Sequence, residues 1–202
     1  MIHTGGCSLT AGFNTEHNWT DHLGVPVTNH AAIAGSNQRT WRRLHDAVQE
    51  GARRLIMQIT TVERKEWWIP PTSAARTHYV ENYRGEHTFK FKYGSHIDNP
   101  DPITRKASKI NYNFVSEQWE HDDFMRQHRQ FDAWCAQQGV ETLYLASRKY
   151  ISPHPEHCLD VTEILEQHHL PNDPWHLSEL GHQVMAARVL DHITSTFPHW
   201  LD

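Results

Sequence analysis

The sequence has few cysteines and no long apolar stretch. Its 202 residues include only Cys7, Cys135 and Cys158, whose odd number and irregular spacing exclude a disulfide framework, so we expect free thiols. No apolar run approaches the roughly 20 residues that cross a membrane. The first residues are neither basic nor apolar enough for a signal peptide. We therefore expect a soluble, cytoplasmic protein with no membrane partner.

Charge of one sign is not concentrated in any segment. The formal net charge is −5 with histidine neutral, and acidic and basic residues are interspersed. The chain lacks the basic stripe that a nucleic-acid surface needs, so we expect no nucleic-acid partner. Since 38% of the residues are hydrophobic, length and composition suit one domain over residues 1–202 with an ordinary core.

Histidine is abundant, with 18 residues. Two groups contain residue types that bind metals: "HPEHC", with His154, His157 and Cys158, and the adjacent pair His168 and His169. No paired Cys-x-x-Cys and no H-E-x-x-H accompanies them, and H-x-x-H-C alone is a weak zinc signal. We expect surface histidines and neither a metal ion nor another cofactor.

Apolar runs of strand length alternate with helical patterns. The runs are residues 26–33, 54–61 and 141–147. The periodic apolar residues between and after these runs are Trp41, Leu44, Val48, Phe124, Phe131 and Cys135, and then Leu177, Leu180, Val184, Ala187, Leu190 and Ile193 for a closing helix. Gly51 is the expected C-cap of the first helix. The alternation predicts an α/β fold with a mainly parallel sheet covered on both faces.

The region from about residue 70 to residue 113 breaks this alternation. It is polar and contains the turn signals "PPTS", "YRGEH", "YGSH" and "NPDP". Within it, "TFKFKYG" alternates aromatic residues with Lys90 and Lys92, as a half-exposed strand does. We interpret the region as an insertion over one edge of the sheet, either a lid or a decorative hairpin.

Serine and histidine near opposite ends of the chain suggest a catalytic pair. Ser8 lies in "GGCSLTAG", directly after a strand-like start, where parallel-sheet proteins place their sites. Asp173 and His176 are three residues apart in "NDPWHLSELGH", close enough for the carboxylate to orient the imidazole as a base. Taken singly, each feature also fits a structural reading: a serine in a glycine-rich turn, or an aspartate at a helix cap.

Three segments together resemble the conserved blocks of the SGNH (GDSL-like) hydrolases. "GCSLTAG" is similar to their first block, "NHAAIAGSNQRTWRRL" to the second, and "DPWHLSELGH" to the last. Their order and spacing match across nearly the whole chain, apart from residues 70–113. The G-C-S-L-T-A-G opening with a following tryptophan, together with G-S-N in the second block, resembles one subgroup of this superfamily.

The resemblance implies a three-layer α/β/α sandwich with a short, mainly parallel sheet of the flavodoxin-like type. It also implies a Ser8–His176–Asp173 triad, with the Ser8 and Gly35 amides as oxyanion donors. In that mechanism His176 takes the Ser8 proton as the hydroxyl attacks an ester carbonyl, and water later releases the acyl-enzyme.

Two positions depart from the pattern of the superfamily. Its third block, G-x-N-D, supplies an asparagine as third oxyanion donor, whereas the matching place here reads "MQITTVER". Either Thr60 or Asn37 is the candidate replacement, because a hydroxyl or an amide can each donate a hydrogen bond. Cys7 replaces the aspartate of the first block. We interpret Cys7 as a small buried residue whose side chain points away from that of Ser8, with a role as nucleophile as the weaker alternative.

The stretch "TTVERKEWW" follows the third strand, on the expected rim of the site. Arg64 could clamp a carboxylate or phosphate, with Glu66 beside it, and Trp67 and Trp68 could stack on a sugar or line an acyl groove. In the structural alternative, Arg64 pairs with Glu66 while a tryptophan fills the core.

Two functions from different classes follow. The first is a serine esterase or deacetylase that acts on a small-molecule or carbohydrate ester, such as an acetyl ester. The second is a catalytically weak or inactive module of the same fold that binds glycan or peptide, and the absence of G-x-N-D motivates it. Nothing in the sequence fixes the oligomeric state.

Overall fold

The computed structural model describes residues 1–33, 35–62, 65–69, 80–83, 86–91, 116–148, 151, 155 and 158–201, with the backbone alone for 65–69, 80–83, 86–91 and 117. Its main element is a five-stranded sheet in the order β2-β1-β3-β7-β8, and every neighbouring pair is parallel. The strands are β1 (Ile2–Gly5), β2 (Val27–Asn29), β3 (Arg54–Gln58), β7 (Glu141–Ala146) and β8 (Cys158–Asp160).

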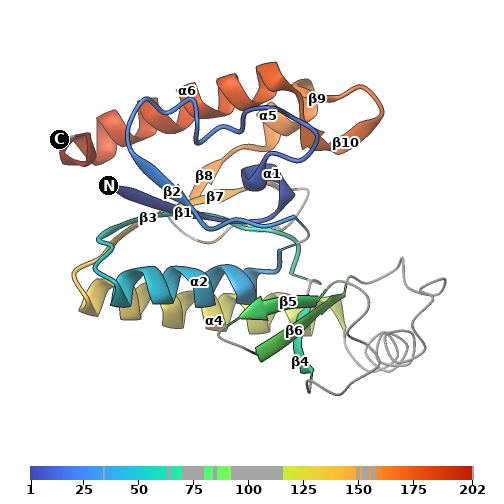
Figure 1. Cartoon of the computed structure of the whole chain (residues 1–202), viewed down its shortest axis with the longest axis vertical. Coiled ribbons are helices and arrows are strands. Elements are labelled where there is room, and N and C mark those ends of the chain that lie inside the picture. The colour runs from blue at the N-terminus through green and yellow to red at the C-terminus, as the bar shows by residue number, and fades with distance from the viewer. Residues whose placement is uncertain are drawn as a thin grey trace.

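Helices cover both faces of this sheet. On one face lie α5 (Thr162–Gln167) and α6 (Glu179–Thr196), and on the other lie α2 (Asn37–Gln49) and α4 (Glu117–Gln137) (Figure 1). The α/β/α layering that the sequence predicts is therefore confirmed, and the protein has an α/β fold with a mainly parallel sheet. Right-handed crossover helices are the usual way to join parallel strands, which is why the strand runs alternate with helical patterns.

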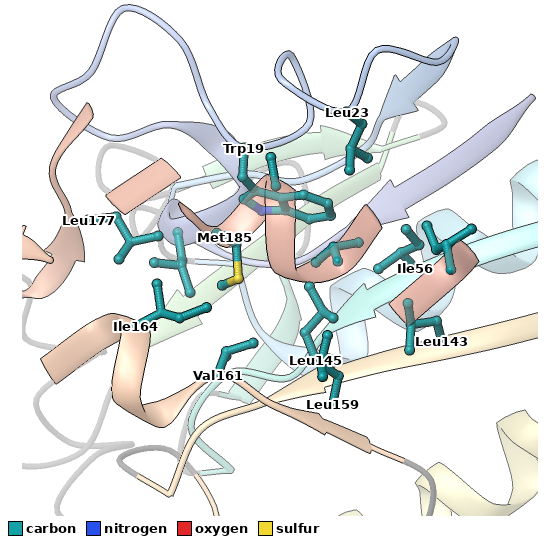
Figure 2. Packing of buried hydrophobic residues seen from close by; sticks show 14 of the residues in the cluster. Trp19, Leu23, Ile56, Leu143, Leu145, Leu159, Val161, Ile164, Leu177 and Met185 are labelled. Atoms are coloured by element: carbon teal, nitrogen blue, oxygen red, sulfur yellow. The ribbon is translucent and has the colours of Figure 1, made fainter. Parts of the chain in front are cut away.

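Alternation along the central strands divides the apolar residues between two cores. Ile56 and Leu145 belong to the cluster beneath α5 and α6, whereas the adjacent Met57 and Tyr144 belong to the cluster beneath α2 and α4. Successive side chains of a strand point to opposite faces, so a strand buried on both sides needs an unbroken apolar run. Figure 2 shows the first cluster, in which Trp19, Leu145 and Met185 come from three separate segments.

The stripes expected on α2 and α4 are confirmed. Trp41, Leu44 and Val48 are buried in α2, and Phe124, Phe131 and Cys135 in α4. The helix α2 ends at Gln49, with Glu50 rather than Gly51 as its C-cap, and Gly51 follows with a φ of 109°. The strand expected over residues 26–33 is shorter, because only Val27–Asn29 pairs with β1.

The closing helix differs from its expected face and start. Leu177 lies in a strand before the helix, and Leu180 is 58% exposed. The buried apolar residues of α6 are Met185, Ala186, Val189 and Ile193, of which the expected stripe contained only Ile193, while Val184 and Leu190 are partly buried against the same core. The segment has apolar residues on two overlapping registers of 3.6-residue periodicity, and packing against the sheet selects the second one.

Two small antiparallel sheets were not expected from the sequence in this form. β9 (His169–Leu170) and β10 (Asp173–Leu177) form a hairpin just before α6, with an irregular register between Asp173 and Leu177. β4 (Lys65–Ile69), β5 (Val80–Tyr83) and β6 (Glu86–Phe91) form a three-stranded sheet in the order β4-β6-β5, beside the N-terminal part of α2 (Figure 1).

The strand expected in "TFKFKYG" corresponds to β6 as far as Phe91. Apart from β5 and β6, the 70–113 insertion lies outside the described residues, so its role as a lid or hairpin stays a prediction. Among the helices of the described residues, none is long and apolar enough to span a membrane.

Candidate active site

The first strand delivers Ser8 to the carboxyl end of the parallel sheet. β1 ends at Gly5, and Ser8 is the first residue of the short helix α1 (Ser8–Ala11). In the order β2-β1-β3, the chain leaves β1 to one side for β2 and returns to the other side for β3. In open parallel sheets such a reversal opens a crevice beyond the carboxyl ends of the strands, and ligands bind there. Ser8 follows the strand at that reversal.

The turn before Ser8 exposes a backbone donor. Cys7 is the N-cap of α1 with extended φ and ψ angles of −101° and −155°, and its side chain makes no capping bond. The Ser8 amide is in the first position of the helix, where no intrahelical acceptor exists. Gly12 ends α1 with a φ of 74°, and this left-handed conformation favours glycine.

The two ends of the chain meet at Ser8. The Oγ atom of Ser8 lies 2.8 Å from Nε2 of His176, and Nδ1 of His176 lies 2.5 Å from Oδ2 of Asp173. Ser8 itself is only 6% exposed. The three residues that the sequence predicts as a triad are thus brought together in a chain of two hydrogen bonds.

The hairpin β9–β10 rather than a helix holds Asp173 and His176. The sequence places Asp173 and His176 just before or at the start of the last helix, and both lie on β10. The irregular register of β10 lets residues three apart face one another, which a regular strand with a period of two does not allow. Ser178 then caps α6 by accepting a hydrogen bond from the Gly181 amide.

The environment of Asp173 favours its ionised form. Burial acts to raise the pKa of this carboxyl, but the hydrogen bonds from His176 and from the Trp175 amide outweigh it and hold the pKa below its usual range. An ionised carboxylate that accepts from Nδ1 fixes the imidazole tautomer and leaves Nε2 free to accept the serine proton.

The aromatic ring of Phe13 lies against the imidazole of His176. The ring of Phe13 is 4.5 Å from that of His176, centroid to centroid, at an interplanar angle of 38°. The Phe13 amide donates to the Ser8 carbonyl, so the turn that ends α1 also places this ring. Sequence reasoning missed Phe13, since an aromatic residue five positions after a serine carries no distinctive signal.

Gly35 lies directly beside Gly6 and Cys7, the two residues that precede Ser8. A Cβ atom added to it would stand 2.8 Å from the Gly6 carbonyl oxygen and 2.9 Å from the Ala32 carbonyl oxygen, so only glycine fits without a backbone shift. Its amide donates to the Ala32 carbonyl at 2.9 Å. To serve as an oxyanion donor, this amide would share or exchange that acceptor.

The two candidates for the third oxyanion donor are bonded to one another. Nδ2 of Asn37 donates to the Thr60 carbonyl, and Oδ1 of Asn37 accepts from the Thr60 amide, both at 2.9 Å. This reciprocal pair joins the first residue of α2 to the segment just after β3. The hydroxyl of Thr60 is buried and, within the described residues, has no hydrogen-bond partner. One hydrogen on Asn37 and the hydroxyl of Thr60 therefore remain as donors.

Cys7, the residue before Ser8, is buried against β3. It is 1% exposed, and its Sγ atom donates to Oε1 of Gln58 at 3.1 Å. The Cys7 amide donates to the same oxygen, also at 3.1 Å. The expectation of a small buried side chain directed away from Ser8 agrees with these contacts. Gln58 was missed, although a polar residue within the apolar run "RLIMQITT" was a signal for it.

A second histidine, His182 in α6, is hydrogen-bonded to Trp19. The buried His182 accepts the Trp19 amide on Nδ1 at 3.1 Å, and the Trp19 indole donates to Oγ1 of Thr10 in α1. Burial lowers the pKa of His182 to about 4, consistent with a neutral ring that accepts on Nδ1. Trp19 thus connects α1, which carries Ser8, to α6.

The predicted substrate contacts after the third strand fall on side chains that lie outside the described structure. Arg64 lies outside the described residues, and for Glu66, Trp67 and Trp68 in β4 the structure describes the backbone alone. His154 and His157 also lie outside them. Within the described part of the chain, no three histidine, cysteine, aspartate or glutamate side chains are grouped to hold a metal ion.

Comparison with known proteins gives one kind of match. No protein-family model and no curated protein matches this sequence. Among solved structures, the chain is similar to the psychrotrophic esterase EstA from Pseudoalteromonas sp., in a structure inhibited by monoethylphosphonate, with a TM-score of 0.53 and 9% sequence identity over 96% of each chain. At that identity, the likeness shows a shared fold over nearly the full length of both proteins.

Proposed function

We propose that this protein is a serine esterase of the SGNH type, with Ser8 as nucleophile, His176 as general base and Asp173 as the residue that orients the base. The observation that carries the proposal is the continuous contact from the Ser8 hydroxyl through His176 to Asp173. An esterase as structural neighbour supports it, because the same fold holds that activity in another protein.

In the proposed reaction, Oγ of Ser8 attacks the ester carbonyl carbon while Nε2 of His176 takes the hydroxyl proton. The carbonyl oxygen becomes an oxyanion, to which the Ser8 amide donates. Collapse of this tetrahedral intermediate breaks the bond to the alcohol oxygen, and that oxygen receives the proton from His176. A water molecule then attacks the acyl-enzyme with His176 again as base, which releases the acid and restores Ser8.

Additional donors to the oxyanion are proposed among Gly35, Thr60 and Asn37. A single such donor contributes about 3–4 kcal/mol to transition-state stabilisation. The hydroxyl of Thr60 is the better of the two candidates for the third donor, because it is buried without a partner in the described structure while the Asn37 amide is held by the Thr60 backbone. Glu66, Arg64, Trp67 and Trp68 are proposed to contact the remainder of the substrate.

The substrate class we propose is a small-molecule or carbohydrate ester with a short acyl group. The test is hydrolysis of p-nitrophenyl acetate by the wild type and by Ser8→Ala. A working triad loses at least about 10⁴ in kcat without its nucleophile. If wild type and variant are equally inert on a panel of acyl esters, the esterase proposal fails, and glycan or peptide binding that survives Ser8→Ala would support the binding module instead.

A further inference from the structure

Gln58 is a buried polar residue at the end of β3, directly after the apolar residues Leu55, Ile56 and Met57. It is 1% exposed on β3, the strand next to β1. Its Oε1 atom accepts two hydrogen bonds from Cys7, one from the amide and one from the thiol. Its Nε2 atom donates to the carbonyl of Ile59 at 2.5 Å. A buried amide with both ends bonded is held in one orientation, because a flipped amide would bring NH₂ against the Cys7 N–H.

This contact determines where the next amide points. Cys7 is in an extended conformation, and in extended backbone consecutive N–H groups point to opposite sides. Since the Cys7 N–H is directed to Gln58, the Ser8 N–H is expected on the opposite side of the backbone, away from the Gln58 side chain. That is the amide proposed above to bind the oxyanion.

The close approach of the Gln58 side chain to the turn also explains why residue 6 is glycine. A Cβ atom on Gly6 would lie 2.8 Å from Oε1 of Gln58 and 2.8 Å from Oγ1 of Thr10. A side chain at position 6 would therefore displace Gln58 from the turn. The sequence thus contains both halves of the contact, the polar residue in β3 and the glycine that lets the turn reach it.

We propose that Gln58 is a positioning residue for the oxyanion hole: by holding the Cys7 amide, it directs the Ser8 amide towards the developing charge. This inference rests on the proposed esterase function. Gln58 touches neither Ser8 nor His176 through any hydrogen bond in the described structure, so its effect is exerted through Cys7.

The experiment compares Gln58→Met, which keeps the side-chain length without hydrogen bonds, with Gln58→Glu and Cys7→Ala. Each kcat is divided by the fraction of sites that a fluorophosphonate titrates, so that unfolded protein does not count. We expect Gln58→Met to lower kcat on the order of 10²-fold, with little change in KM, because a misdirected donor weakens only the transition state. The Ki for phenylboronic acid, whose tetrahedral adduct occupies the oxyanion hole, should rise in parallel.

Two variants separate positioning from packing. A protonated glutamic acid can accept from the Cys7 amide and donate to the Ile59 carbonyl, so Gln58→Glu should recover much of the kcat, and its ratio to wild type should fall as pH rises. Cys7→Ala removes only the thiol contact and should cost less than Gln58→Met. Tyr144→Phe, which removes a hydrogen bond to Asp132 from the neighbouring strand β7, is the control for a general loss of stability.

Equal kcat and Ki for Gln58→Met and the wild type would overturn the inference, as would a larger loss in Cys7→Ala. If Gln58→Met does not fold, the pH dependence of Gln58→Glu decides: a constant ratio to wild type overturns it. A wild type without esterase activity is a different result, because it removes the proposed function and is seen before any Gln58 variant is made.

Discussion

Oγ of Ser8 and Nε2 of His176 are 168 positions apart in the sequence and lie 2.8 Å apart in the fold. Ser8 is positioned by the first strand of the parallel sheet, and His176 by a hairpin that leads into the last helix. Trp19 donates hydrogen bonds both to Thr10 in α1, the helix that begins at Ser8, and to His182 in α6, the helix that follows β10. The contact between Ser8 and His176 therefore depends on how the two ends of the chain pack, rather than on any local motif.

Replacing Asp173 by asparagine should reduce kcat by about 10⁴ without unfolding the protein. An asparagine amide can donate to Nδ1 of His176, which selects the tautomer whose Nε2 carries a proton and cannot act as base. The measurement is steady-state ester hydrolysis at neutral pH. Asp132→Asn is the matched control, since Asp132 also accepts two side-chain hydrogen bonds but lies on α4; a similar loss in both variants would contradict the assigned role.

The ring of Phe13 should contribute to keeping His176 in place. Aromatic contacts of this kind contribute about 0.5–1.5 kcal/mol, so Phe13→Ala should lower kcat up to roughly tenfold, whereas Phe13→Tyr should stay close to wild type. The measurement is kcat at saturating ester, together with the thermal midpoint of unfolding. An unchanged kcat in Phe13→Ala would show that the ring does not restrain the base.

Replacing Thr60 by valine should have opposite effects on activity and stability. If its hydroxyl is the third oxyanion donor, kcat falls by about 10²–10³ with little change in KM. Removing a buried hydroxyl without a partner should at the same time stabilise the fold by about 1 kcal/mol. Thr4→Val is the control, because the Thr4 hydroxyl on β1 is likewise buried without a partner in the described structure.

Thr4→Val is expected to raise the free energy of unfolding and to leave kcat unchanged. An equally unchanged kcat in Thr60→Val would remove Thr60 from the oxyanion hole and leave Asn37 as the candidate.

Acid should destabilise the protein through His182. Burial lowers the pKa of this ring to about 4 in the folded state, against 6.5 in the unfolded chain. The unfolded chain therefore binds the proton first, and the stabilisation present above pH 6.5 is lost as pH falls from 6.5 towards 4, by an amount on the order of 3 kcal/mol.

Chemical denaturation of the wild type and of His182→Gln across that pH range measures this effect. A glutamine oxygen can accept the Trp19 amide but does not titrate, so its free energy of unfolding should fall less steeply. The same slope in both proteins would exclude His182 as a source of the acid sensitivity.

Much of the fold was predictable because the pattern of apolar residues follows the geometry of the sheet. Continuous apolar runs in β3 and β7 indicated strands buried on both faces, and Trp41, Leu44 and Val48 indicated the buried face of α2. The predicted buried face of α6 was wrong for Leu180, because the apolar pattern alone does not show which of two neighbouring helix faces packs against the sheet. The hairpin β9–β10 carries no alternating pattern, so it was not predicted.

The residues of the candidate triad could be found because Ser8, Asp173 and His176 lie in segments similar to known blocks. Phe13 could not, because its contact with His176 is set by the turn after α1. Gln58 was visible only as a polar residue in an apolar run, since its partner is set by the approach of β3 to the turn before Ser8. Such contacts arise from tertiary packing, so the sequence can contain both residues of a contact without showing that they meet.

Activity-based labelling is the sharpest test of Ser8 as the proposed nucleophile. The protein is incubated with a fluorophosphonate, and the modified residue is mapped by mass spectrometry of peptides. We expect one adduct on Ser8, no labelling of Ser8→Ala, and much slower labelling of His176→Ala, because the hydroxyl is a weak nucleophile without its base. Labelling of another residue, or equal labelling of wild type and Ser8→Ala, would contradict this assignment.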